Sequence, residues 1–158
     1  MNLLPLFQWC EASLVGETIR ASLWLFPAVE CVHLLGLVLL GGSVLIVDMR
    51  LLGLGLCGQG VRELAREAER FMVAGIVLML ASGIPLFLSE AVKCYYSQAF
   101  WVKIFTLVPA IVFALTVRRR VVMAGEGRIG ASRQGLVALT SLGLWFTVAA
   151  AGRWIGFS

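Results

Sequence analysis

The 158-residue chain is 60% hydrophobic and only 14% charged, with a mean hydropathy of +0.94 and a formal net charge of +4. A soluble globular domain averages about 25% charged residues, so this composition excludes an ordinary soluble domain. The positive charge does not require nucleic acid, because Lys and Arg beside membrane helices face anionic lipid head groups. We therefore expect an integral membrane protein whose partners include membrane lipids and no nucleic acid.

The first twenty residues precede the first long apolar run. They begin without basic residues, and Glu11 and Glu17 interrupt the apolar pattern, unlike a cleaved secretory signal. Apolar side chains recur through this segment at Leu3, Leu4, Leu6, Phe7, Trp9, Leu14 and Ile19. The pattern predicts a short N-terminal amphipathic helix lying in the membrane interface.

Four continuous apolar runs follow, each near the roughly 20 residues that a helix needs to cross a bilayer. They cover residues 21–47, 71–91, 101–117 and 135–157. Continuous runs favour helices, because a membrane barrel would show short segments of alternating polarity. Gly83, Pro85 and Pro109 interrupt the second and third runs and predict kinks. The predicted fold is an all-α integral membrane four-helix bundle, with residues 1–158 as a single transmembrane domain.

The basic residues predict the orientation. Of thirteen, nine follow the first and third spans: Arg50, Arg62, Arg66, Arg70, Arg118, Arg119, Arg120, Arg128 and Arg133. Connections rich in Lys and Arg stay in the cytoplasm, so both termini should face outward, which in a bacterial inner membrane is the periplasm. Aromatic residues gather at the proposed outer boundary, as in an aromatic belt: Trp24, Tyr95, Tyr96, Trp101 and Trp154.

Cysteine positions suggest one covalent link. Cys10 and Cys94 both fall in outward segments, where a disulfide between them is possible, whereas Cys57 is expected in the cytoplasm and Cys31 within the first span. There is no CxxC pair, so a structural zinc site has little support.

Residues 53–58 match the glycine fingerprint of dinucleotide-binding proteins, but that fingerprint works only between a strand and a helix. Here it follows a membrane helix, so we expect a flexible turn. Hydrolytic motifs such as GxSxG and HExxH do not occur. Whether the chain is an enzyme stays open.

Polar residues inside the apolar runs are the candidate functional positions, because they are costly at bilayer depth. The first span contains Glu30, His33 and, near its inner end, Asp48. At 100° per residue, Glu30 and Asp48 both fall about 60° from His33 on the helix circumference. Trp24 and Cys31 fall near the opposite side. The stripe is therefore expected to face the bundle and the aromatic side to face lipid.

His33 is the only histidine, and it supports several interpretations. In one interpretation it is an axial ligand of haem b, and the second ligand is Met79, at a similar depth in the second span, or a residue elsewhere, or none. A bis-histidine site would need two chains, and copper or another metal is a further alternative. In the structural alternative, His33 hydrogen-bonds a neighbouring helix while Glu30 pairs with Arg20 or Arg153.

Two other patterns predict architecture. Gly143, Thr147 and Ala151 recur at four-residue spacing, with Thr140 and Ala150 near the same side, which is typical of close helix packing in membranes. Asp48 is expected to form a salt bridge with Arg50 or with the run Arg118 to Arg120. Apart from such a bridge, this run is expected to act as a topology anchor, which keeps its end of the span at the cytoplasmic surface.

The chain also resembles a family of small bacterial four-helix membrane proteins of unknown function. The resemblance rests on Pro27 to His33 (PAVECVH), Asp48 to Gly53 (DMRLLG), Phe100 to Lys103 (FWVK) and Gly152-Arg153. It implies an inner-membrane bundle and supplies no activity. The positions it marks for testing are Glu30, His33, Asp48, Arg50, Lys103 and Arg153.

Three functions remain as hypotheses. The chain is a haem- or cofactor-binding electron-transfer component that meets quinone in the bilayer, a non-catalytic structural subunit of a larger membrane complex, or a small proton-linked transporter using Glu30 and His33. A bundle of this size is expected to form a homo-oligomer or to join a larger membrane complex.

Overall fold

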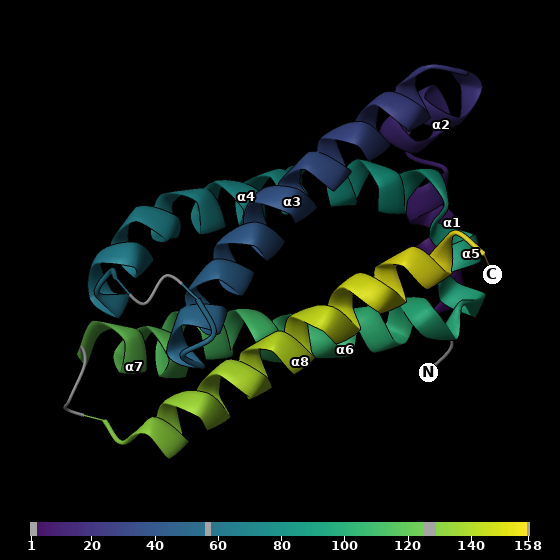
Figure 1. The fold of residues 1–158 in the computed structure, drawn as a ribbon. Helices are drawn as coiled ribbons and strands as arrows, with labels where there is room; N and C mark the ends of the chain where they lie inside the picture. The colour runs from purple at the N-terminus through teal and green to yellow at the C-terminus, as the bar shows by residue number, and fades with distance from the viewer. Residues whose placement is uncertain (1–2, 56–57, 125–128, 158) are drawn as a thin grey trace.

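The computed structural model describes residues 3–55, 58–124 and 129–157, and the long elements are all helices (Figure 1). Four segments are long and apolar enough to cross a membrane by length and composition. They are α3 (Leu25–Leu51), α4 (Val61–Ser89), the continuous segment of α6 (Gln98–Phe113), η1 (Ala114–Arg118) and α7 (Arg119–Ala124), and α8 (Ala131–Ile155). The predicted all-α membrane four-helix bundle is confirmed.

The helices extend beyond the apolar runs that predicted them. α4 begins at Val61, ten residues before the predicted run, because residues 61–70 form an amphipathic extension. Val61, Leu64 and Ala65 are buried at helical spacing while the charged residues between them are exposed. The third span likewise continues to Ala124 instead of ending at residue 117. The predicted apolar runs end at the first charged residues, whereas the backbone hydrogen bonds of the helices continue past them.

The N-terminal segment forms two short helices, α1 (Leu4–Glu11) and α2 (Leu14–Ala21). Ser13 separates them, and its Oγ accepts a hydrogen bond from Gly16 N at 3.3 Å, which caps α2. Arg20 Nη1 donates to the Ser89 carbonyl at 2.9 Å, and Glu11 Oε2 accepts from Val92 N. These bonds fasten the segment to the junction of α4 and α5 (Ala91–Tyr96), so it is part of the bundle and not only an interfacial helix.

The four spans are arranged as two pairs. α3 packs along α4, α6 packs along α8, and α3 also contacts α8, whereas α4 and α6 have no comparable interface over the described residues. Figure 1 shows the α3–α4 pair lying over the α6–α8 pair, with α1, α5 and both termini at one end and α7 at the other. The bundle is thus closed along the α3–α8 side. Which end faces the cytoplasm stays a prediction.

The end of the bundle that contains α7 holds the larger apolar core. Its buried residues come from α3, α4, α7 and α8: Val47, Leu51, Val61, Leu64, Ala65, Val121, Val122, Val137 and Ala138. Further along, α3 and α4 approach closely through glycines, since a Cβ atom at Gly75 would lie only 2.6 Å from Leu40 N. This contact brings two backbones together, as small residues do between membrane helices.

All three described cysteines, Cys10, Cys31 and Cys94, are free, so the possible disulfide between Cys10 and Cys94 is not formed in this structure. Cys57 and Arg128 lie outside the described residues, as does part of the predicted turn over residues 53–58. Gly53 adopts a φ of 74°, which agrees with a turn at its start.

Cys94 is expected to react slowly with maleimides. Burial, reinforced by the Glu90 carboxylate, raises the pKa of the Cys94 thiol from 9.0 to about 11. The reactive thiolate is then about 100-fold rarer at pH 8 than in the unfolded chain. A variant with Cys94 as its sole cysteine should label at least that much more slowly when native than in SDS. Equal rates in the two states would contradict this burial.

Candidate functional site

An apolar cavity of about 520 Å³ lies between the two helix pairs. Its walls are mostly Leu, Ile, Phe and Trp side chains from α3, α4, α6 and α8, and Phe7 of α1 contributes from the terminal end. Its volume lies within the range of about 300 to 1,000 Å³ typical of small-molecule and cofactor sites. His33 and Lys103 are the two ionisable side chains among the described residues that line it.

The His33 ring is held by α4. Its Nδ1 lies 2.9 Å from Ser82 Oγ, and the Ser82 hydroxyl donates its own proton to the Leu78 carbonyl at 2.5 Å. Because that proton is already used, Ser82 Oγ accepts, and Nδ1 must carry the hydrogen in the neutral ring. In the neutral ring the lone pair is then on Nε2, the nitrogen that can bind a ligand. Gly83 packs against the ring, since a Cβ atom there would lie 3.2 Å from Cε1.

Lys103 comes from α6, across the cavity from the α3–α4 pair. Its aliphatic stem packs on α8, where a Cβ atom at Gly152 would lie 3.5 Å from Cε and 3.3 Å from Nζ. Within residues 3–55, 58–124 and 129–157, its ammonium has no hydrogen-bond or ion-pair partner. It interacts electrostatically with His33 and with Cys94 of α5. The sequence suggested Lys103 only as a source of countercharge for Glu30 and His33, together with Arg153.

Met79 lines the same cavity as His33, and both residues belong to the α3–α4 pair. Met79 packs against α3, because a Cβ atom at Gly36 would lie 3.2 Å from Met79 Cγ. The lining residues that α6 and α8 contribute contain no histidine, methionine or cysteine. His33 and Met79 therefore share one wall instead of facing each other across the cavity.

The cavity opens toward the surrounding membrane between α4 and α6. Leu80 and Ile84 of α4 and Ile104 of α6 line it and are also 47%, 59% and 37% exposed. This is the side on which the two helix pairs have no close interface. An apolar molecule dissolved in the bilayer can thus reach the cavity sideways.

The structure corrects the expected stripe on α3. Glu30 is exposed and makes no ion pair or hydrogen bond with His33 or with any other residue that the structure describes, so the predicted Glu30–His33 pair is absent. Trp24 and Cys31 are exposed and Asp48 is buried, as expected. Arg153 is also exposed, with its guanidinium 5.0 Å from the centre of the Phe157 ring, so it does not line the cavity.

A protein-family model matches residues 6–158 of the chain. The family, DUF6644, is described as a family of unknown function. The chain belongs to this family. Nothing matches it among curated proteins or among solved structures. The family assignment agrees with the expectation of a family of unknown function. The activity of this DUF6644 protein is therefore inferred from its sites.

A second polar centre of this DUF6644 protein joins three spans. Asp48 is fully buried, and its Oδ1 accepts a hydrogen bond from Arg118 Nε at 2.7 Å. Arg118 Nη2 also reaches the Val44 carbonyl at 3.4 Å. From α8, Ser141 interacts with the carboxylate, although neither Ser141 Oγ nor Asp48 Oδ2 makes a hydrogen bond of normal geometry with a described residue.

The predicted salt bridge of Asp48 is confirmed with Arg118, whereas Arg50 turns away and donates through Nε to the Gln59 carbonyl at 2.9 Å. Arg118 is only 5% exposed, so it is a core residue and not the surface anchor that its run of arginines suggested. It ends the π-helical turn η1, which adds a residue to the turn and rotates the following side chains by about 100°.

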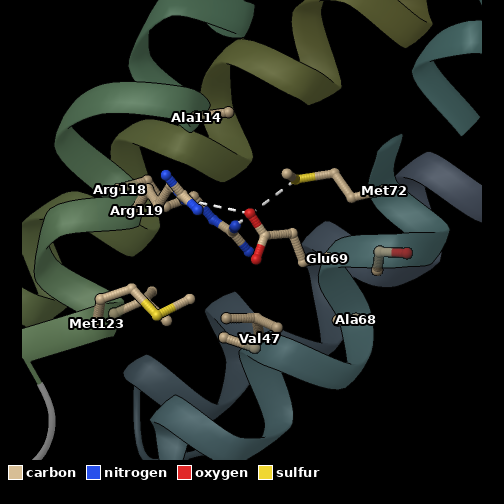
Figure 2. A pocket seen from close by; sticks show the side chains of 11 residues that line it. Val47, Ala68, Glu69, Met72, Ala114, Arg118, Arg119 and Met123 are labelled. Atoms are coloured by element: carbon tan, nitrogen blue, oxygen red, sulfur yellow. Dashed lines mark hydrogen bonds and ion pairs between the residues drawn. The ribbon is translucent and has the colours of Figure 1, made fainter. Parts of the chain in front are cut away.

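Figure 2 shows a small pocket beside this centre, where Arg118 and Arg119 lie toward Met72 and Glu69. Arg119 Nε is 3.1 Å from Glu69 Oε1, and Arg118 Nη1 is 3.9 Å from Met72 Sδ. The pocket volume of about 20 Å³ is enough for a single water molecule, which needs roughly 10 to 15 Å³. The pocket therefore belongs to the ion pair and is too small for a cofactor.

The small-residue strip of α8 does not pack within the chain. Gly143 and Thr147 are exposed, and no atom lies within 4 Å of a Cβ built at Gly143. Thr140 and Ala150 are exposed as well, and only Ala151 is buried. Within the described chain the strip therefore packs against no other span, because α8 turns Val137, Ala138 and Ser141 inward instead. Close packing of the strip against a partner helix stays a prediction.

The described residues contain no cluster of three or more His, Cys, Asp or Glu side chains with the geometry to hold a metal ion. The positions that the sequence singled out thus separate into two sites. His33, Met79 and Lys103 meet at the cavity, and Asp48 belongs to the ion-paired centre. Glu30, Arg50 and Arg153 belong to neither.

Proposed function

We propose that this DUF6644 protein binds haem b in the cavity, with His33 as an iron ligand, and acts as a small redox component of the membrane. The observation that carries the proposal is the Ser82-bound His33 ring at a largely apolar cavity. Metal-ligating histidines commonly donate the other ring N–H to a neighbouring oxygen, which fixes the tautomer and the ring orientation. Ser82 provides that oxygen here.

One histidine is sufficient for this cofactor. A haem brings four nitrogen ligands of its own, so the protein needs to supply only one or two more. The cavity volume of about 520 Å³ and its apolar walls suit a flat, largely hydrophobic molecule. When bound, a haem supplies one-electron chemistry, and the chain's residues hold and orient it.

Met79 is not required as a second ligand in this proposal. A second ligand on the opposite face of a porphyrin must come from the other side of its plane. Met79 lies on the same wall as His33, and α6 and α8 offer no ligating side chain among the lining residues. We therefore assign the iron to His33 alone.

A membrane quinone is the proposed electron partner. Quinones are apolar and dissolve in the bilayer, and the cavity opens sideways at Leu80, Ile84 and Ile104. A quinone can thus approach the cavity without passing through water.

The test is the visible absorption spectrum of the protein purified from cells grown with adequate iron. We expect a Soret band that shifts on reduction with dithionite. His33→Gly should abolish the band, and added imidazole should restore it by occupying the vacated space. Ser82→Ala should weaken haem binding about 10- to 100-fold, as loss of an outer-shell partner usually does.

Met79→Leu should leave the band unchanged, and Glu30→Gln serves as the matched control because Glu30 is exposed outside the cavity. Restoration by imidazole separates the loss of a ligand from misfolding. The proposal fails if the wild-type protein stays colourless after incubation with haem, or if His33→Gly keeps the full Soret band.

A structural subunit of a larger membrane complex is the second candidate function. The exposed strip formed by Thr140, Gly143 and Thr147 favours it, because small residues allow a partner helix to approach closely. A colourless protein whose His33→Gly variant keeps full stability and assembly would leave this function as the better explanation.

A further inference from the structure

The Lys103 ammonium is the unexplained charge of the cavity. It lies in a membrane-spanning helix, lines an apolar cavity and has no hydrogen-bond or ion-pair partner in the described parts of the chain. Charged side chains at membrane depth usually pair with another group or face a functional pathway. Since the described residues provide no such partner, a ligand is expected to supply it.

The lysine is held inside the bundle. Lysines near helix ends often extend along the helix so that the ammonium reaches the interface. Here the stem lies against the backbone of α8, where a Cβ atom at Gly152 would lie within 3.7 Å of Cδ, Cε and Nζ. The side chain thus spans from α6 to α8 and places its Nζ atom at the cavity wall.

We infer that the cavity takes an amphiphile with a carboxylate head, which Lys103 binds while the apolar body occupies the space toward His33. A single ammonium matches a singly charged carboxylate, whereas a phosphate would call for more donors than the described lining residues offer. The sideways opening between α4 and α6 admits the apolar body from the bilayer.

Two molecules share this chemistry: a haem, through a propionate, and a long-chain fatty acid. For haem, the inference rests on the proposed function, while for a fatty acid it stands without it. In both cases the carboxylate would bind Lys103 on one side of the cavity, and the rest of the ligand would contact His33.

The test compares acids with their neutral esters in wild-type protein and in Lys103→Met, which keeps the length of the side chain and removes its charge. The first pair of probes is iron protoporphyrin IX and its dimethyl ester, followed by the Soret band. The second pair is doxyl-stearate and its methyl ester, followed by quenching of tryptophan fluorescence, since Trp101 and Trp145 line the cavity.

We expect Lys103→Met to weaken binding of at least one acid about tenfold or more, as loss of a charged hydrogen bond does. Binding of the corresponding ester should stay unchanged, and Lys103→Arg should retain acid binding. Lys93→Met is the matched control, because Lys93 lies on α5 and pairs with Glu90 at 3.7 Å.

The outcomes separate this inference from the proposed function. If doxyl-stearate binding depends on Lys103 while no haem binds, the inference holds and the haem proposal fails. If haem and its ester bind equally well to wild-type protein and to Lys103→Met, and doxyl-stearate binding is also unaffected, the inference is overturned and the haem proposal stands. If wild-type protein binds neither acid, the inference is overturned as well.

Discussion

Replacing Arg118 with leucine is expected to lower the free energy of unfolding by about 3 to 5 kcal/mol. The change leaves the Asp48 carboxylate fully buried without its partner, at a position where Oδ2 already has no hydrogen bond of normal geometry with a described residue. An uncompensated charge in the interior costs far more than the loss of a surface pair. Unfolding by SDS titration in detergent micelles measures the effect.

Arg119→Leu is the matched control, because Arg119 is the next residue and its ion pair with Glu69 is exposed. Its loss should cost about 1 kcal/mol or less. The double variant Asp48→Leu/Arg118→Leu should recover most of the lost stability, since both charges are then gone. Equal effects of Arg118→Leu and Arg119→Leu would show that the buried pair does not stabilise the bundle.

Replacing Gly75 with valine should separate α3 from α4 and cost about 1 to 3 kcal/mol. A Cβ atom at Gly75 would lie 2.6 Å from Leu40 N and 2.9 Å from the Gly36 carbonyl oxygen. Both are backbone atoms of α3, so no side-chain rotation can relieve the clash. The midpoint of thermal unfolding in detergent measures the loss.

Gly143→Val gives the comparison, because nothing lies within 4 Å of a Cβ at Gly143. It should leave the unfolding of the monomer nearly unchanged and affect only association with other membrane helices. A loss of monomer stability as large as that of Gly75→Val would mean that backbone propensity, and not the clash with α3, dominates both results.

The sequence predicted the four spans well because membrane insertion depends on the summed hydropathy of each segment, which is a local property. It also identified His33 and Met79, which line the same cavity, and the salt bridge of Asp48 with the arginine run. It placed Glu30 on the buried stripe, which was wrong. A residue only 60° from His33 around the helix axis can already face lipid, because the sequence does not show how wide the packed face of the helix is.

The amino-acid sequence by itself thus determined a membrane bundle of four helices and the burial of Asp48. Only the tertiary structure decided which of its polar residues meet. The roles of Ser82 and Lys103 depend on where α4 and α6 stand relative to α3 and α8, and the burial of Arg118 depends on a π turn that no hydropathy pattern records. Contacts between helices follow from how side chains of distant segments fit together, and periodicity within one helix contains no information about its neighbours.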